Sequence, residues 1–457
     1  MGTMASFSSL PVEIVQEVVH YLTHDWVGLN GPAVHDDPPP QGIFRSWRKV
    51  DGASKYAPVS KTWQDAVERE TFAELHLGLA RLAEADAIIN AVPRRQKYVR
   101  SIWLNVQLPS RQTADTTEGD NQILQDTFRA FLSTLRHWTP GPPVSLQLHA
   151  YALTDKARWN DAPGRSTMPQ PSPHPLLELL DYDEIMSCVP VNFVTEFGME
   201  RNRVFGRRIS PASVCALLAR LPACRKISLN NWWDNGDDNA DVRNAFGKAV
   251  RNITHPIDYF HIAGSYSDDV DSRPTQQPET GHDELSESLG LLSLRVQKLD
   301  LYTIVVSDDL FLQHPSSSQS PSPPAHWERL EHLALCYPPV TPAGTRLFAA
   351  DSNVTQSFLQ RRYLAGAHAA LEMPLLKSMT LVADLKAGEE WHKFCYLCGP
   401  KKRRKTAAVK KTATAIWTSS SGFVPDDEVL DAWKAVPRKD IMDTELVVQV
   451  LDDEHAI

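Results

Sequence analysis

Short apolar runs that recur along the chain constrain its fold more than any other feature of the sequence. Seven runs of five or six residues have the length and apolar content of β-strands, and they are VRSIWL, VSLQL, RKISL, IDYFHI, VQKLDL, LEHLAL and LKSMTL. Their last residues lie 44, 81, 33, 39, 34 and 46 residues apart, from Leu104 to Leu381. The interval of 81 is about two periods, and VNFVTEF at 191–197 supplies a strand within it.

Helical patterns fall between these runs, at 123–138, 211–221 and 361–373. A repeated helix–turn–strand unit predicts a solenoid with a parallel sheet, in which each repeat covers the apolar face of its neighbour. The period is longer and less regular than that of a standard leucine-rich repeat. We therefore expect an α/β protein with an irregular leucine-rich-repeat-like solenoid. The alternative is an unrelated α/β domain with similar strands.

Composition limits the environment and the partners of the chain. The 457 residues are 42% hydrophobic, which is enough for a sizeable core, and the formal net charge is -9. This charge argues against a general nucleic-acid-binding protein, and no apolar run approaches the roughly 18 residues that span a bilayer. The N-terminus has no signal-peptide pattern, and the six cysteines are too sparse for a disulfide framework. We expect a cytoplasmic or nuclear protein, or one found in both, without nucleic-acid or membrane partners.

The first helical pattern is FSSLPVEIVQEVVHYL at 7–22. Pro11 suits the first helical position, and Leu10, Ile14, Val18 and Leu22 recur every four residues. This spacing is that of one face of an amphipathic helix. The face either packs on the protein's own core or binds a partner.

A second helical pattern occupies KYAPVSKTWQDAVERETFAELHL at 55–77. Its apolar positions include Val59, Trp63 and Val67, and a tryptophan on a short helix is a frequent anchor at protein interfaces. Two or three short helices enclose little core by themselves. The unit must therefore bury apolar surface against the rest of the chain or against a partner.

Together the two patterns resemble an F-box, whose usual form is LP-x-E-I…I…L followed by V-[CS]-K-x-W. The matching residues are Leu10, Pro11, Glu13, Ile14, Val18 and Leu22, then Val59, Ser60, Lys61 and Trp63. One departure is the 36 residues between Leu22 and Val59, more than the family normally has. The excess is rich in proline and glycine, which indicates an inserted loop at 26–54.

This resemblance implies binding to the Skp adaptor of SCF-type ubiquitin ligases, and through it to a cullin ligase. The adaptor-binding residues would be Leu10, Pro11, Ile14, Val18, Leu22, Val59 and Trp63. The leucine at the N-cap position, where serine or aspartate is preferred, would then belong to the docking surface.

The chain also resembles a group of fungal F-box proteins, which carry RRxxVRxIWLxVxLP after the F-box and TP-x-G-x-x-LF later. Here these phrases occupy 94–109 and 341–348. We expect an F-box helical domain at 1–76, a linker helix at 77–98 and a target-binding repeat domain at 99–457. The resemblance implies no activity for the C-terminal region.

Motifs for catalysis or cofactor binding are missing from the sequence. It has no glycine-rich phosphate loop, no G-x-S-x-G elbow and no H-E-x-x-H. His392, Cys395 and Cys398 are three zinc-ligand types without an evident fourth. H-W-E at 326–328 with C-Y-L-C at 395–398 faintly resembles a zinc deaminase, but Phe394 stands in place of the proline. We therefore expect no catalytic residues, no cofactor and no metal.

Two function classes remain. In the first, the chain is a non-catalytic substrate receptor of a ubiquitin ligase: the F-box binds the Skp adaptor and the repeat domain binds a target protein. In the second, it is a ligase-independent, repeat-type protein-interaction scaffold with a degenerate F-box. A stand-alone enzyme has no motif in its favour.

The strongest charge run, KKRRKTAAVKK at 401–411, generates the first testable prediction. It is either a nuclear-import signal or a solvated loop between repeats. If it is an import signal, replacing Lys401, Lys402, Arg403, Arg404 and Lys405 with alanine should move a fluorescent fusion out of the nucleus. An unchanged distribution in fluorescence microscopy would support the solvated loop.

Overall fold

A computed structural model gives the fold of the chain. The residues it describes are 11–23, 57–109, 117–138, 141–152, 175–200, 207–234, 240–265, 283–312, 326–338, 341–342, 352–384, 391–400, 411–420, 423–438 and 446–452.

The described strands form one sheet. They are β1 (Glu74–Gly78), β2 (Ser101–Leu108), β3 (Val144–Ala152), β4 (Val194–Glu200), β5 (Lys226–Asp234), β6 (Ile257–Ser265), β7 (Val296–Tyr302), β8 (His332–Tyr337), β9 (Ser378–Asp384), β10 (Trp391–Pro400), β11 (Lys411–Ser419) and β12 (Leu446–Asp452). Their order in the sheet is their order in the chain. All neighbours from β1 to β9 are parallel. β10 is antiparallel to both β9 and β11, and β12 is parallel to β11.

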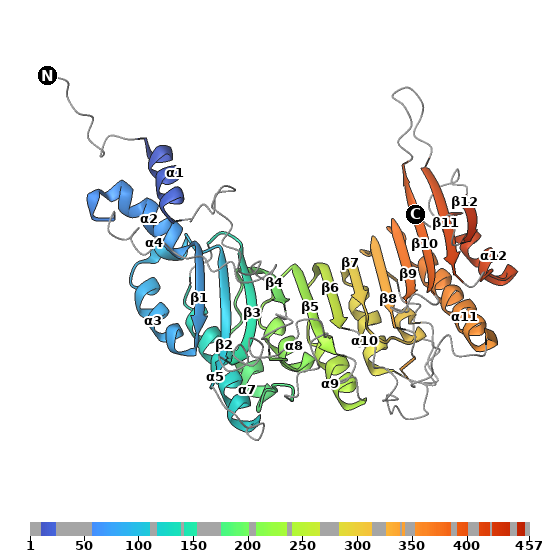
Figure 1. Cartoon of the computed structure of the whole chain (residues 1–457), viewed down its shortest axis with the longest axis horizontal. Coiled ribbons are helices and arrows are strands. Elements are labelled where there is room, and N and C mark those ends of the chain that lie inside the picture. The colour runs from blue at the N-terminus through green and yellow to red at the C-terminus, as the bar shows by residue number, and fades with distance from the viewer. Residues whose placement is uncertain are drawn as a thin grey trace, which may run out of the picture.

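The helices follow one another along the row of strands (Figure 1). They are α1 (Val12–Thr23), α2 (Lys61–Ala73), α3 (Leu79–Asn90), α4 (Pro93–Gln96), α5 (Thr117–Leu135), α7 (Tyr182–Ser187), α8 (Pro211–Ala219), α9 (Ala240–Arg251), α10 (Glu284–Ser293), α11 (Ser352–Leu371) and α12 (Asp427–Ala435), with the 3-10 helices η5 (Asp308–Phe311) and η6 (Val436–Arg438). From α3 to α11 they lie in the connections between parallel strands, which need crossovers of this kind.

The core lies between the sheet and these helices, because alternate residues of each strand point to opposite faces. One row of residues, paired from strand to strand, is at most 3% exposed. We call it the inner row: Ile102, Leu146, Phe197, Ile227, Phe260, Leu299, Leu333 and Met379. Helix residues such as Phe128, Leu217 and Leu289 belong to the same core.

The opposite face of the sheet carries a second row in register. We call it the open-face row, and it consists of Trp103, Gln147, Gly198, Ser228, His261, Asp300, Ala334 and Thr380. Most of its side chains are polar, and the row is less buried than the inner row. A sheet that is covered on one side only has this division between an apolar face and a polar face.

The expectation of an α/β protein is confirmed. All seven strand-like runs lie in strands of one sheet, as does most of VNFVTEF in β4. LEHLAL and LKSMTL form β8 and β9, which are direct neighbours.

Two features differ from the expectations. The sheet begins at β1, inside the residues 1–76 expected to form the helical domain, and α3, within the expected linker helix at 77–98, is its first crossover. The sheet also contains an antiparallel strand near its C-terminal end, since β10 runs opposite to both β9 and β11. The run ELHLG was too short to recognise alone. Only ten residues separate β10 from β11, fewer than a parallel crossover needs.

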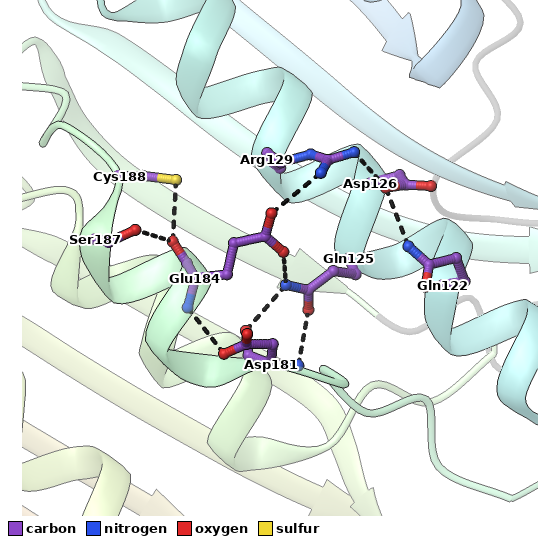
Figure 2. Close-up of polar contacts among 8 residues, drawn as sticks. All are labelled: Gln122, Gln125, Asp126, Arg129, Asp181, Glu184, Ser187 and Cys188. Carbon is purple, nitrogen blue, oxygen red and sulfur yellow. Dashed lines mark hydrogen bonds and ion pairs between the residues drawn. The ribbon is translucent and has the colours of Figure 1, made fainter.

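Polar side chains join the crossover of one repeat to that of the next (Figure 2). Glu184 of α7 accepts hydrogen bonds from Arg129 at 3.1 Å and Gln125 at 2.5 Å, both on α5. The Gln125 amide also donates to the carbonyl of Asp181 at 2.9 Å, and Asp181 caps α7 through the Glu184 N–H. These contacts fix how α7 packs beside α5.

Two glycines, one in α10 and one in α11, test how closely these helices pack on their surroundings. A Cβ on Gly290 of α10 would lie 2.5 Å from the carbonyl oxygen of Leu310, whereas one on Gly366 of α11 would meet side chains of Met379 and Leu381 no closer than 3.5 Å. Alanine is favoured over glycine in a helix by about 0.5–1 kcal/mol, but overpacking costs about 1–3 kcal/mol.

We therefore expect Gly290→Ala to destabilise the protein by about 0.5–2 kcal/mol, the difference between these two effects. Gly366→Ala, without the clash, should stabilise it by about 0.5–1 kcal/mol. Urea unfolding followed by tryptophan fluorescence measures both variants. Shifts of the same sign would show that backbone contact at Gly290 does not control α10 packing.

Candidate interaction surface

α1 and α2 form a small helical unit with a core of its own. Val15 and Val19 of α1 pack with Trp63, Ala66 and Val67 of α2 in a cluster separate from the main core. Ser60 begins α2, because its hydroxyl accepts a hydrogen bond from the Trp63 N–H at 3.3 Å. Such a cap supplies a partner for one of the free N–H groups of the first turn.

The other side of α1 remains exposed. Ile14 is 43% and Val18 is 36% exposed, and Pro11 lies one turn before them and is exposed as well. Residues spaced by three and four lie on one helix face, so these three form a single apolar strip, which we call the α1 surface. Val59, just before α2, is 52% exposed.

The structure divides the residues that the F-box resemblance selected. Pro11, Ile14, Val18 and Val59 are exposed, as a docking surface requires. Leu10 lies outside the described residues, and Leu22 lies in α1 without a described side chain. Glu13 and Lys61 are exposed, and half-buried Ser60 is the cap of α2.

Trp63, in contrast, is buried. It is only 5% exposed, and its ring belongs to the core of the helical unit rather than to the exposed strip. The physical reason is that the unit is small and the tryptophan is its largest apolar side chain. A partner that binds α1 would therefore meet Trp63 indirectly, through the position of Val15 and Val19.

Glu68 attaches the helical unit to the sheet domain. Its carboxylate accepts from Arg94 at 3.0 Å and from Arg95 at 3.0 Å, both on α4. Burial raises the pKa of the Glu68 carboxyl, but the hydrogen bonds and charges of Arg95 and Arg94 outweigh this effect, and the pKa is lowered overall. This contact is not recognisable from the sequence, because the residues are 26 and 27 positions apart and only their opposite charges are visible there.

Two further contacts reinforce the attachment. The Tyr98 hydroxyl donates to Asp65 of α2, and the Arg95 guanidinium lies 5.0 Å from the centroid of the Phe72 ring. The Arg100 N–H donates to the carbonyl of Ala73 at 2.8 Å, at the junction of α2 and β1. The helical unit is thus fixed beside the first strands of the sheet, with its apolar strip exposed.

The His392, Cys395 and Cys398 set is spread along β10. His392 and Cys398 are on the core side, about 20 Å apart at the rise of a strand, whereas Cys395 points to the other face beside Thr380. Within the described residues, no group of three or more histidine, cysteine or acidic side chains could hold a metal ion.

Two further expectations from the sequence concern membrane-spanning helices and the basic run. None of the helices described is both long and apolar enough to cross a bilayer. Lys401–Lys405 of the candidate nuclear-import signal lie outside the described residues.

Comparison with known proteins finds one similarity. Residues 252–456 match a family of unknown function, DUF6546. This match spans the described strands from β6 to β12 and does not reach α1 or α2. No curated protein and no solved structure matches the chain.

The Glu68 contact generates a prediction about pH. Glu68→Gln removes the charge that pairs with Arg94 and Arg95, and it should weaken the attachment of α2 by about 1.5–3 kcal/mol, the usual range for hydrogen bonds to charged groups. The folded-state pKa lies below the ordinary 4.5, so the contribution is present above pH 4.5 and is lost as pH falls through the lower folded value.

Amide hydrogen exchange of residues 61–73 measures this effect. At pH 7 the variant should exchange faster than wild type, and after correction for intrinsic rates the difference should shrink in acid. Glu17→Gln, at an exposed position of α1, is the control and should leave α2 unchanged. A difference in exchange rate that persists unchanged below the pKa of Glu68 would show that the charge of Glu68 does not hold α2 in place.

Proposed function

We propose that the protein is a non-catalytic substrate receptor of an SCF-type ubiquitin ligase. The helical unit of α1 and α2 is an F-box that binds the Skp adaptor, and through it a cullin ligase. The sheet domain, as an irregular leucine-rich-repeat-like solenoid, binds a target protein. The observation that carries this proposal is the exposed apolar strip of α1 at F-box motif positions.

The strip consists of apolar residues of α1 that the core of the helical unit does not bury. Val15 and Val19 face Trp63, and α1 has no second partner for Ile14 and Val18 among the described residues. Fully burying one such aliphatic side chain stabilises a complex by about 1.5–3 kcal/mol. A partner with an apolar groove would therefore be stabilised by burying the part of the strip that is still exposed, and the F-box resemblance implies the Skp adaptor as that partner.

The sheet domain supports the receptor proposal through its construction. Each parallel strand from β1 to β9 pairs with the next along the chain, as successive repeats of a solenoid do. Such stacking leaves an extended open face, a surface suited to binding another protein. The ligase would supply the chemistry, because holding the target close to the ligase raises the effective concentration of its lysines.

The α1 surface gives the test of this function. Ile14→Asp with Val18→Asp should reduce binding to recombinant Skp adaptor at least a hundredfold. The variant loses the further burial of two aliphatic side chains that are 43% and 36% exposed, and it places two unpaired carboxylates against an apolar partner, which is costly. About 1.4 kcal/mol corresponds to tenfold in affinity. Co-purification and isothermal titration calorimetry measure the loss.

A matched control introduces the same charge elsewhere. Ile88 on α3 is 47% exposed, so Ile88→Asp places an aspartate at an exposed apolar position outside the F-box and should bind the adaptor normally. Unchanged melting temperatures show that the variants fold. Wild-type binding by the double variant would exclude the α1 surface. Failure of the wild-type chain to bind any Skp adaptor would favour the ligase-independent scaffold.

A further inference from the structure

A cluster of rings and charges lies at the middle of the open face. Tyr259 and His261 of β6 and Lys298, Asp300 and Tyr302 of β7 alternate along two neighbouring strands, with Tyr259 opposite Lys298 and His261 opposite Asp300. We call these five residues the β6–β7 cluster. Strand alternation places all five side chains on the same face.

Asp300 is the most buried member of the cluster. It is only 4% exposed, although it lies on the polar face. The His261 ring lies 6.0 Å from the Tyr259 ring and 5.5 Å from the Tyr302 ring, measured between centroids. A carboxylate at such a position needs a cation or hydrogen-bond donors, because an isolated buried charge is costly.

The rings around Asp300 are neutral near pH 7. Burial raises the pKa of Tyr259 to about 12, with further contributions from the Asp300 charge and hydrogen bond. Burial, followed by the Asp300 charge, also raises the pKa of Tyr302. Burial lowers the pKa of His261, and the smaller effect of Asp300 does not reverse this. The cluster without Lys298 therefore presents one negative charge and electron-rich ring faces.

The chain's own Lys298 shows what kind of group this environment accepts. The Lys298 ammonium lies 4.8 Å from the centroid of the Tyr259 ring and 2.9 Å from an Asp300 oxygen. Rings and carboxylates together are the usual surroundings of a bound ammonium group. The Lys298 side chain is 45% exposed, and its long flexible stem permits the ammonium to leave for solvent.

The most exposed members of the cluster are Lys298 and Tyr302. In the open-face row, Asp300 lies between His261 and Ala334, and His332 and Cys336 of β8 lie opposite Lys298 and Tyr302. Tyr302 is 39% exposed. Thr303, which follows it, has φ of 56°, which is rare for a β-branched residue. Its hydroxyl donates to the carbonyl of Gly264 at 2.6 Å, and this contact holds the end of β7 against β6.

We propose that the β6–β7 cluster binds a lysine side chain of the target protein, whose ammonium replaces that of Lys298 between Tyr259 and Asp300. The inference rests on the proposed role of the sheet domain in target binding and specifies the partner: a protein segment that presents lysine. The net charge of -9 on the chain favours such a basic segment.

Peptides of defined charge test this proposal with the full-length protein. The probe is a fluorescein-labelled nine-residue peptide, three copies of Gly-Ser-Lys, measured by fluorescence anisotropy at low salt against the same peptide with Glu for Lys. Lys298→Met removes the competing ammonium and should strengthen binding of the lysine peptide. Asp300→Asn should weaken it. A cation–π site with a carboxylate predicts changes of about threefold to thirtyfold.

Matched controls separate this subsite from the effect of overall charge. Lys434 and Asp431 of α12 form an ion pair at 2.8 Å, and both side chains are exposed. Lys434→Met and Asp431→Asn make the same charge changes as Lys298→Met and Asp300→Asn, and they should alter peptide binding less than twofold. Equal effects of both pairs, or no effect of Asp300→Asn, would overturn the proposal.

Two further measurements keep the result interpretable. Thermal melts show whether Asp300→Asn remains folded. If Asp300→Asn does not fold, Tyr302→Leu replaces it as the test, because this exposed substitution weakens the ring contacts and leaves the carboxylate in place. Tyr302→Leu should also weaken lysine-peptide binding, and wild-type affinity would contradict the subsite. Adaptor binding depends on α1 and a different partner, so failure of the peptide test and failure of the receptor proposal are separate results.

Discussion

The structure depends on the register that joins each strand to the next. Parallel pairing aligns Ile102, Leu146, Phe197 and their counterparts through Met379 into one inner row, at most 3% exposed. A single strand with its crossover helix would leave this row in water, so each repeat is stabilised by its neighbours. The two ends of such an array need other cover. At one end the helical unit is fixed to α4 through Glu68. Near the other, Trp433 of α12 packs on Phe394 of β10, with 4.4 Å between ring centroids.

Much of this fold could be predicted from the sequence, because the runs are short, apolar and regularly spaced. Runs such as LEHLAL and LKSMTL lie in strands since every one of them supplies a residue to the inner row. β1 escaped recognition because ELHLG gives only two inward residues, Leu75 and Leu77. The antiparallel end escaped because the direction of β10 depends on how its connection runs, which spacing alone does not specify. The positions of helices and strands thus follow from the local sequence pattern, whereas the direction in which strands pair follows from the connections between them.

The candidate sites were predictable to a lesser extent. Helical spacing identified the apolar stripe of α1, but it could not divide the stripe between a buried side, Val15 and Val19, and an exposed side, Ile14 and Val18. That division depends on where Trp63 packs. The β6–β7 cluster leaves a trace in the sequence, since IDYFHI and VQKLDLY carry polar or aromatic side chains at alternate positions. Only the pairing of β6 with β7 places Tyr259 beside Lys298 and His261 beside Asp300.

The proposed receptor function uses two different surfaces: α1 for the ligase adaptor and the open sheet face for a target. Hydrogen–deuterium exchange of the full chain, alone and with recombinant Skp adaptor, tests this division most directly. We predict that the adaptor protects amides in residues 11–23 and near Val59 while the strands from β1 to β9 exchange as before. Protection confined to the sheet, or no protection anywhere at saturating adaptor, would contradict it.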